Sequence, residues 1–180
     1  EIPPELRASA APLLALLGPI NRQIAAADKR LAARAKHEPV VRRLCSTPGV
    51  GPVTAVSFVA TLDQVERFER AHQVESYLGL VPRESSSGEK QHKGRITKAG
   101  NGRTRWLWVE AAWAILRGER CEAAPLRAWA ERIAKRRGKS VAAVALARRL
   151  AGILFALWRD GSEYRVDRLR QPQGSASAAA

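Results

Sequence analysis

The sequence predicts a mainly α-helical protein: a helical domain that carries one basic loop or short β-hairpin and follows a coiled-coil-like helical segment. Two observations lead to this fold class. Apolar residues recur at spacings of three and four along most of the 180 residues, which is the period of an amphipathic helix. Residues 81–102 are the least helical stretch of the chain and suit a loop or a two-stranded hairpin. A chain of this length can form one ordinary domain or two small ones.

The first segment, residues 1–37, shows the seven-residue repeat of a coiled coil. Its apolar positions, alternately four and three residues apart, are Leu13, Leu17, Ile20, Ile24, Ala27 and Leu31. This seam favours pairing with another helix. The alternative is an amphipathic helix that packs on its own domain, because two to three heptads are too few to distinguish it from a coiled coil. Because proline removes a helical hydrogen bond, Gly18-Pro19 predicts two helices or one sharp kink, with the second helix running from Pro19 to Lys36.

Residues 38–160 form the predicted main domain, which opens with a helix, a glycine hairpin and a second helix. The first helix begins at Pro39 and stops at Thr47, and Pro52 suits the first turn of the second. We interpret the unit as a helix-hairpin-helix motif, in which the glycines let the backbone approach a phosphate and the second helix directs free N–H groups at the same anion. The predicted DNA contacts are Gly49, Val50, Gly51 and Thr54. A tight turn between packed helices is the alternative.

The least helical stretch, residues 81–102, is rich in cations. The predicted DNA-binding residues in it and just after it are Arg83, Lys90, Lys93, Arg95, Lys98, Arg103 and Arg105. Three consecutive serines, residues 85–87, lie among them. Three serines before a glycine usually form a solvated turn, but a positive field around a hydroxyl also suits attack on a phosphate. His92 is a possible base, although a single loop histidine is usually incidental.

Three helices are predicted after the basic stretch, over residues 103–117, 124–137 and 141–158. The first carries a stripe at spacings of three, four and three, formed by Trp106, Val109, Trp113 and Leu116. We interpret the stripe as a core face, with a base-stacking surface as the lesser alternative. Ser140 is the predicted cap of the last helix, whose apolar face includes Leu146 and Leu150. Residues 161–180 are polar and basic and are predicted to be a frayed tail.

Net charge narrows the classes of function. The chain has 31 Lys and Arg against 17 Asp and Glu, a formal charge of +14, which favours nucleic acid as partner and an anionic membrane surface second.

Cys45 and Cys121 have no neighbouring ligands at zinc-site spacing and make no disulfide framework, which suits a reducing cytosol. The uncharged run 44–62 is broken by proline and glycine, so it is not a membrane helix, and no signal peptide is present.

The motifs together resemble one family. The segments that carry the likeness are TPGVGPVTA at 47–55, YLGLVP at 77–82, SSGEK at 86–90, KGRITKAGN at 93–101, Arg105, and VEAAW at 109–113. In order and spacing they are similar to the carboxyl-terminal transposase domain of the IS110 family of bacterial insertion sequences, the serine recombinases guided by a bridge RNA. The likeness covers about residues 40–116, and the heptads before it resemble the coiled coil of that family. Because the chain has no methionine, we expect it to be the carboxyl-terminal part of a longer protein.

The resemblance implies a serine that attacks a DNA phosphate and forms a transient phosphoserine bond. Ser87 is the expected nucleophile and Ser86 the next candidate. In the family, a RuvC-like amino-terminal domain with an acidic tetrad binds Mg²⁺. No metal site or cofactor is expected in this chain, which would be inactive without that domain. The implied partners are DNA, a guide RNA, the RuvC-like domain and further copies of the chain, without a membrane, in the bacterial cytoplasm near the nucleoid.

The alternative is a binding module without chemistry. A basic helical domain with a helix-hairpin-helix motif can hold DNA or structured RNA through the phosphate backbone alone. A ribosomal-type RNA binder is a weaker third reading.

Overall fold

Helices make up most of the structure, a computed structural model that describes residues 3–87 and 90–169. The α-helices are α1 (Pro4–His37), α2 (Pro39–Leu44), α3 (Pro52–Leu62), α4 (Ala71–Tyr77), α5 (Gly102–Arg117), α6 (Ala124–Arg137) and α7 (Lys139–Arg159). Strands β1 (Pro82–Ser87) and β2 (Lys90–Ile96) form one antiparallel pair, and short 3-10 turns are η1 (Val65–Arg67), η2 (Cys121–Ala123) and η3 (Val166–Leu169). The mainly α fold with a short β-hairpin is therefore confirmed.

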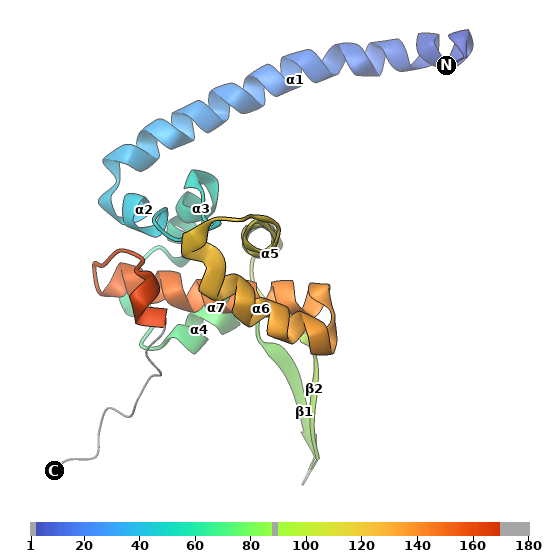
Figure 1. Ribbon diagram of the computed structural model, residues 1–180. Helices are drawn as coiled ribbons and strands as arrows, with labels where there is room; N and C mark the ends of the chain where they lie inside the picture. The colour runs from blue at the N-terminus through green and yellow to red at the C-terminus, as the bar shows by residue number, and fades with distance from the viewer. Residues whose placement is uncertain (1–2, 88–89, 170–180) are drawn as a thin grey trace, which may run out of the picture.

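Helix α7 lies at the centre of the core and packs against α2, α4, α5 and α6 (Figure 1). Its leucines at 146, 150 and 154 are fully buried, because a spacing of four residues keeps them on one face of a helix. Phe58 of α3 and Trp108 of α5 meet edge to face beside this helix, with ring centroids 5.1 Å apart. Each such buried apolar side chain contributes about 1.5–3 kcal/mol to folding, so α7 holds the other helices together.

Length and composition alone would let α7 cross a membrane, and it passes that test within the described part of the chain. Half of its apolar stretch is buried against the rest of the protein. The hydrophobicity of α7 is therefore accounted for by its central place in the core. Its N-terminal cap position is Gly138, with no side-chain capping bond, so the prediction that Ser140 caps this helix is wrong.

Helix α1 is continuous, and the prediction of a break or sharp kink at Gly18-Pro19 is wrong. Pro12 and Pro19 both lie inside it, and the helix bends gently along its length as it leaves the body (Figure 1). Most of α1 is exposed, so a carbonyl that loses its helical partner to a proline can bond to water. Only the last part of α1 packs against α2 and α3, with Ala35 buried.

The fully buried residues of helix α5 are not the ones that the sequence suggested. Trp108, Ala111 and Ile115 are buried, whereas Trp106 is 58% exposed and Trp113 is only half-buried. Two stripes with helical spacing exist on this helix, on opposite sides. The structure buries the stripe that contains alanines, since small residues let α5 approach α3 and α7 closely. The assignment of the Trp106 stripe to the core is thus right only in part, because Val109 and Leu116 are partly buried against the core whereas Trp106 is exposed.

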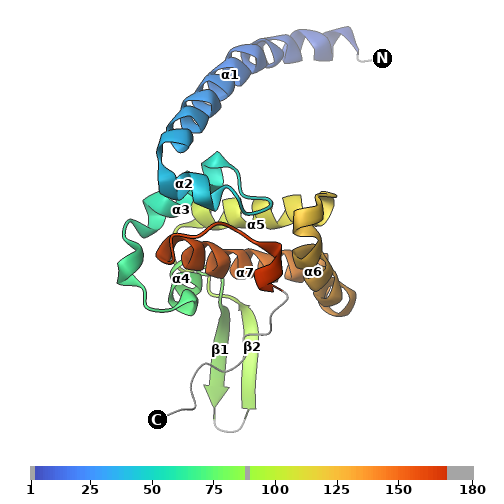
Figure 2. The same cartoon turned by 60° about the vertical axis from the view of Figure 1, so that its left-hand side comes forward.

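The β-hairpin projects from the helical body on the side away from α1 (Figures 1 and 2). Its register pairs Ser87 with Lys90 and Glu84 with Lys93, and an irregularity lies between Pro82 and Glu84. The strands leave the body after α4 and return to it before α5. Everything that the hairpin carries is therefore placed by these two helices.

Candidate nucleic-acid interface

Two glycines bring the ends of the hairpin together. Gly79 and Gly100 both have positive φ, +69° and +76°. A Cβ atom on Gly79 would overlap the carbonyl oxygen of Ala99, and one on Gly100 would overlap that of Tyr77. Only glycine accepts both this conformation and this close approach without strain. The hairpin is thus joined to the body by direct packing of backbone on backbone.

Backbone hydrogen bonds complete the base of the hairpin. The N–H of Lys98 donates to the carbonyl of Gly79 at 3.2 Å, and the N–H of Thr97 donates to that of Val81 at 2.8 Å. The Nη1 atom of Arg105 adds bonds to the carbonyls of Leu78 at 3.5 Å and Ala99 at 3.1 Å. Arg105 was predicted to bind DNA. In the structure its guanidinium group ties the two ends of the hairpin to α5.

The other predicted cations lie on the hairpin and at its base. Arg83, Arg95, Lys98 and Arg103 are exposed, and Nη2 of Arg83 donates to the carbonyl of Thr97 at 3.4 Å. Lys90 and Lys93 are in β2, and their side chains lie outside the described part of the structure. These cations therefore lie partly on the projecting hairpin and partly where it joins α5.

Ser86 and Ser87 are the last two residues of β1. Their backbones pair with Gln91 and Lys90, while their side chains lie outside the described part. Gly88, which follows Ser87, and Glu89 lie outside the described residues. The predicted nucleophiles thus stand at the far end of the hairpin from the helical body.

The glycine turn between α2 and α3 has one exposed glycine and one that packs against α5. Gly49 has φ +78°, and a Cβ atom there would lie 2.6 Å from the carbonyl oxygen of Ala111 in α5. Val50 and Thr54 are also buried. Gly51 precedes α3 with open space around its Cα. Four residues of this glycine turn were predicted to contact DNA. Gly51 alone of them is exposed, while Gly49, Val50 and Thr54 face the protein interior or are packed against it.

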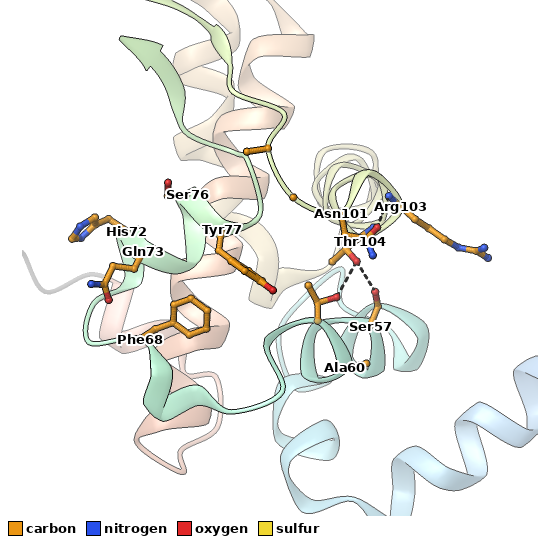
Figure 3. Close-up of a pocket in the computed structure, with 13 residues that line it drawn as sticks. Ser57, Ala60, Phe68, His72, Gln73, Ser76, Tyr77, Asn101, Arg103 and Thr104 are labelled. Carbon is orange, nitrogen blue, oxygen red and sulfur yellow. Dashed lines mark hydrogen bonds between the residues drawn. The ribbon is translucent and has the colours of Figure 1, made fainter.

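A cavity of about 950 Å³ opens between α3, α4 and the start of α5, at the base of the hairpin (Figure 3). One wall has three hydroxyl groups from two helices. The Oγ1 atom of Thr104 lies 3.0 Å from Oγ1 of Thr61 and 3.3 Å from Oγ of Ser57, both within hydrogen-bonding range. Asn101 lines the same side and caps α5, its Oδ1 accepting bonds from the backbone N–H groups of Arg103 and Thr104.

The opposite wall of the cavity is aromatic. Tyr77 of α4 is 42% exposed, and its ring meets that of Phe68 edge to face with centroids 5.4 Å apart. The guanidinium carbon of Arg67 lies 5.9 Å from the Tyr77 centroid. An ion pair between Glu75 and Arg148 fastens α4 to α7 behind this wall. Sequence reasoning missed the cavity, because its residues come from four separate segments of the chain.

Acidic and sulfur ligands do not gather in the part of the chain that the structure describes. There, no group of three or more His, Cys, Asp or Glu is placed to hold a metal ion. Cys45 and Cys121 are both free thiols. The candidate site, formed by the hairpin and the cavity where it joins the body, therefore consists of cations, hydroxyl groups and aromatic rings. These groups suit the phosphate and the nucleobase of a nucleic acid.

Residues 41–125 match the IS116/IS110/IS902 transposase family. The chain belongs to this family. The transposase of insertion sequence element IS1111A from Coxiella burnetii is 37% identical over 148 residues, covering 81% of this chain and 41% of the relative. A probable family 20 transposase of Pseudomonas aeruginosa is 32% identical over 146 residues, covering 81% and 43% respectively. A protein of insertion element IS110 from Streptomyces coelicolor is 30% identical over 169 residues, covering 93% and 40%.

The chain spans less than half the length of each of these three IS110-type relatives. The matched family segment contains the glycine turn, the cavity residues, the whole hairpin and α5. It ends near the start of α6, so the central helix α7 lies beyond it. The family signature therefore coincides with the candidate site.

Proposed function

We propose that this chain is the DNA strand-exchange domain of an IS110-type transposase, cutting and rejoining DNA with a serine nucleophile. One observation carries the proposal: the family segment, residues 41–125, includes both the hairpin, with the serines, Arg83 and Arg95, and its base, with the exposed Lys98 and Arg103. DNA is the proposed substrate, and the place of action is the cytoplasm.

In the proposed reaction the hydroxyl oxygen of Ser87 attacks the phosphorus of a DNA phosphodiester. A bond forms between that oxygen and phosphorus, the bond from phosphorus to one deoxyribose oxygen breaks, and the proton that the serine loses passes through water to the leaving deoxyribose oxygen. The deoxyribose hydroxyl that is released, or one from another strand, later attacks the phosphoserine and restores the diester. The bond energy is thus kept for rejoining, and no external energy source is required.

The register of the hairpin supports Ser87 over Ser86. Residues that face each other directly in an antiparallel pair belong to the same face. Ser87 is opposite Lys90, and Ser86 is opposite Gln91. A cation beside the reacting phosphate stabilises the negative charge that develops there. Lys90 is paired directly with Ser87, whereas the cation on the face of Ser86, Lys93, is paired with the acidic Glu84, so Ser87 is the better place for the nucleophile.

The remaining cations would hold the DNA backbone. Arg83, Arg95, Lys98 and Arg103 are exposed around the hairpin, and the N-terminal end of α3 at Gly51 offers backbone N–H groups. Contacts of this type fix position and do not read sequence. We therefore assign the choice of target to a guide RNA, and the Mg²⁺ that assists phosphate transfer to a RuvC-like domain, because the described residues contain no suitable acidic group.

A covalent adduct tests the proposal. The chain is combined with the RuvC-like domain, guide RNA, Mg²⁺ and labelled donor DNA, and the mixture is quenched in detergent. A protein-DNA band that disappears in Ser87→Ala and persists in Ser86→Ala supports the assignment. A band lost only in Ser86→Ala moves the nucleophile by one residue. A band that survives in both variants contradicts serine chemistry on this hairpin.

A binding module without chemistry is the second candidate function. The net charge of +14 and the exposed cations at the hairpin favour it for the chain by itself. It predicts salt-sensitive DNA or RNA binding and no covalent adduct under any of the conditions above.

A further inference from the structure

We propose that the cavity between α3, α4 and α5 binds one unpaired nucleotide of the DNA on which the domain acts. The base would stack on Tyr77, its polar edge would meet the hydroxyls of Ser57, Thr61 and Thr104, and its phosphate would approach Arg103. This inference rests on the proposed function, because it requires the domain to hold DNA.

The chemistry of the walls fits a nucleotide. Among the described residues that line the cavity none is acidic, whereas Arg103 is a cation. An anion can therefore enter without meeting a carboxylate. The volume, about 950 Å³, is within the range of cavities that bind small organic molecules, about 300–1,000 Å³.

Tyr77 provides the surface on which a base can stack. It is a large aromatic side chain that stays 42% exposed although α4 is fastened to the core. Figure 3 shows its ring reaching from α4 toward Ser57 and Thr104 across the cavity. Aromatic rings in this kind of position bind nucleobases of any sequence, because every base has a flat π face.

The hydroxyl groups opposite Tyr77 have bonding capacity left over. Each hydroxyl has one proton and two lone pairs, and the three groups share only the two contacts of 3.0 and 3.3 Å. The amide N–H₂ of Asn101 is a further donor, because the helix cap uses its Oδ1. Donors and acceptors that can rotate suit the mixed edge of a nucleobase.

The cavity lies at a distance from Ser87, where the proposed reaction takes place. It lies at the base of the hairpin and Ser87 at the other end of β1, five residues beyond Pro82, which is about 17 Å for an extended strand. The bound nucleotide is therefore not the one that is cut. It lies on a neighbouring stretch of DNA and would fix how the duplex approaches the hairpin.

Trp106 is a competing stacking surface, and the test must separate the two. It is 58% exposed on the face of α5 turned away from the core, whereas Thr104, two residues earlier, is buried at the cavity wall. Trp106→Ala is thus a matched control for Tyr77→Ala. Each removes one exposed aromatic ring, and only Tyr77 lines the cavity.

The experiment measures the affinity of the full chain for three short DNA duplexes by fluorescence anisotropy at one salt concentration. One is fully paired, one has a single unpaired nucleotide, and one has an abasic site at that position. We expect the base to strengthen binding about tenfold over the abasic duplex. Tyr77→Ala should remove that difference, while Tyr77→Phe and Trp106→Ala keep it.

A second variant covers the case in which Tyr77→Ala does not fold, as judged by circular dichroism. Ala60 is exposed on α3 and lines the cavity, so Ala60→Trp fills the space from outside the core and should also remove the base-dependent difference. Equal affinity for the base and abasic duplexes in the unmodified chain overturns the proposal. So does a difference that survives Ala60→Trp or one that is lost in Trp106→Ala.

Binding to the fully paired duplex distinguishes failure of the proposed function from failure of the cavity proposal alone. If the unmodified chain does not bind it, the proposed function fails with the cavity proposal. If it binds that duplex with ordinary salt dependence and ignores the unpaired base, only the cavity proposal fails.

Discussion

Gly79 and Ala99 meet at the base of the hairpin so closely that a Cβ atom on Gly79 would overlap the carbonyl oxygen of Ala99. This contact joins the segment that leads into β1 to the segment that leaves β2. It sets the direction of the strands relative to α4 and α5. The position of the candidate nucleophile thus depends on a contact that has no side-chain chemistry.

The first prediction is that Gly79→Ala destabilises the fold. Backbone must move to admit the methyl group, and alanine also disfavours a φ of +69°, so we expect a loss of about 2 kcal/mol or more in the free energy of unfolding. Urea denaturation followed by circular dichroism measures it. Gly51→Ala is the control, with open space at its Cα and an expected change within about 0.5 kcal/mol. Equal midpoints for the two variants would contradict the packing described here.

The second prediction separates packing from phosphate binding in the glycine turn. Gly51→Val should leave stability nearly unchanged and weaken DNA binding about threefold to tenfold, alike for all sequences, because one backbone hydrogen bond to a phosphate is obstructed. Gly49→Val should instead unfold the turn, since its Cβ would lie 2.6 Å from the Ala111 carbonyl oxygen. Anisotropy titrations and melting curves on the same samples give both readouts. Unchanged affinity in Gly51→Val would argue against a helix-hairpin-helix role.

The third prediction concerns salt. Each exposed cation that neutralises a phosphate adds about one unit to the slope of log K against log salt. We expect Arg95→Ala and Lys98→Ala each to reduce that slope by about one, with Arg30→Ala on α1 as the control that leaves it unchanged. Arg105→Ala should lower stability, because its guanidinium bonds the carbonyls of Leu78 and Ala99. An affinity that does not respond to salt in the unmodified chain would remove the electrostatic basis of the site.

The fourth prediction tests whether α1 pairs with a second copy. Leu17 and Ile24 lie on the heptad seam and are 52% and 53% exposed, so pairing of two copies would bury them. Leu17→Glu with Ile24→Glu should then shift the sedimenting mass toward the monomer. Ala26→Glu, exposed and off the seam, should have little effect. Identical sedimentation of all three proteins would speak against self-association through this helix.

The fifth prediction concerns the two thiols. Burial raises the pKa of the Cys45 thiol, so a smaller fraction of it is the reactive thiolate at mildly alkaline pH. Cys121 is exposed. Iodoacetamide should therefore label Cys121 before Cys45, which mass spectrometry of timed digests can follow. Faster labelling of Cys45 would show that α2 opens readily.

The helical class and the hairpin could be predicted because local patterns specify them. The leucines at 146, 150 and 154 repeat with the helical period and are buried, and the loss of that period after residue 81 marks the strands. Helix α5 shows the limit of such reasoning. Its two apolar stripes have the same spacing, and only the neighbours Phe58 and α7 decide that Trp108 is inside and Trp106 outside.

The cavity could not be predicted for a related reason. Ser57, Tyr77 and Thr104 are far apart in the sequence, and each is ordinary in its own surroundings. Their proximity follows from how α3, α4 and α5 pack, which no periodicity reports. Pro19 misled in another way. A proline inside a helix removes one hydrogen bond and crowds the carbonyl four residues earlier, and α1, which is mostly exposed, takes this up as a gentle bend without ending.

The opposite directions of α1 and the hairpin make them mechanically separate. Helix α1 rests on α2 and α3, and the hairpin leaves the body between α4 and α5 at the far end (Figure 2). Defects confined to one arm should therefore not spread to the other. If two copies pair through α1 as the fourth prediction states, a substitution on the hairpin of one copy should leave that pairing intact.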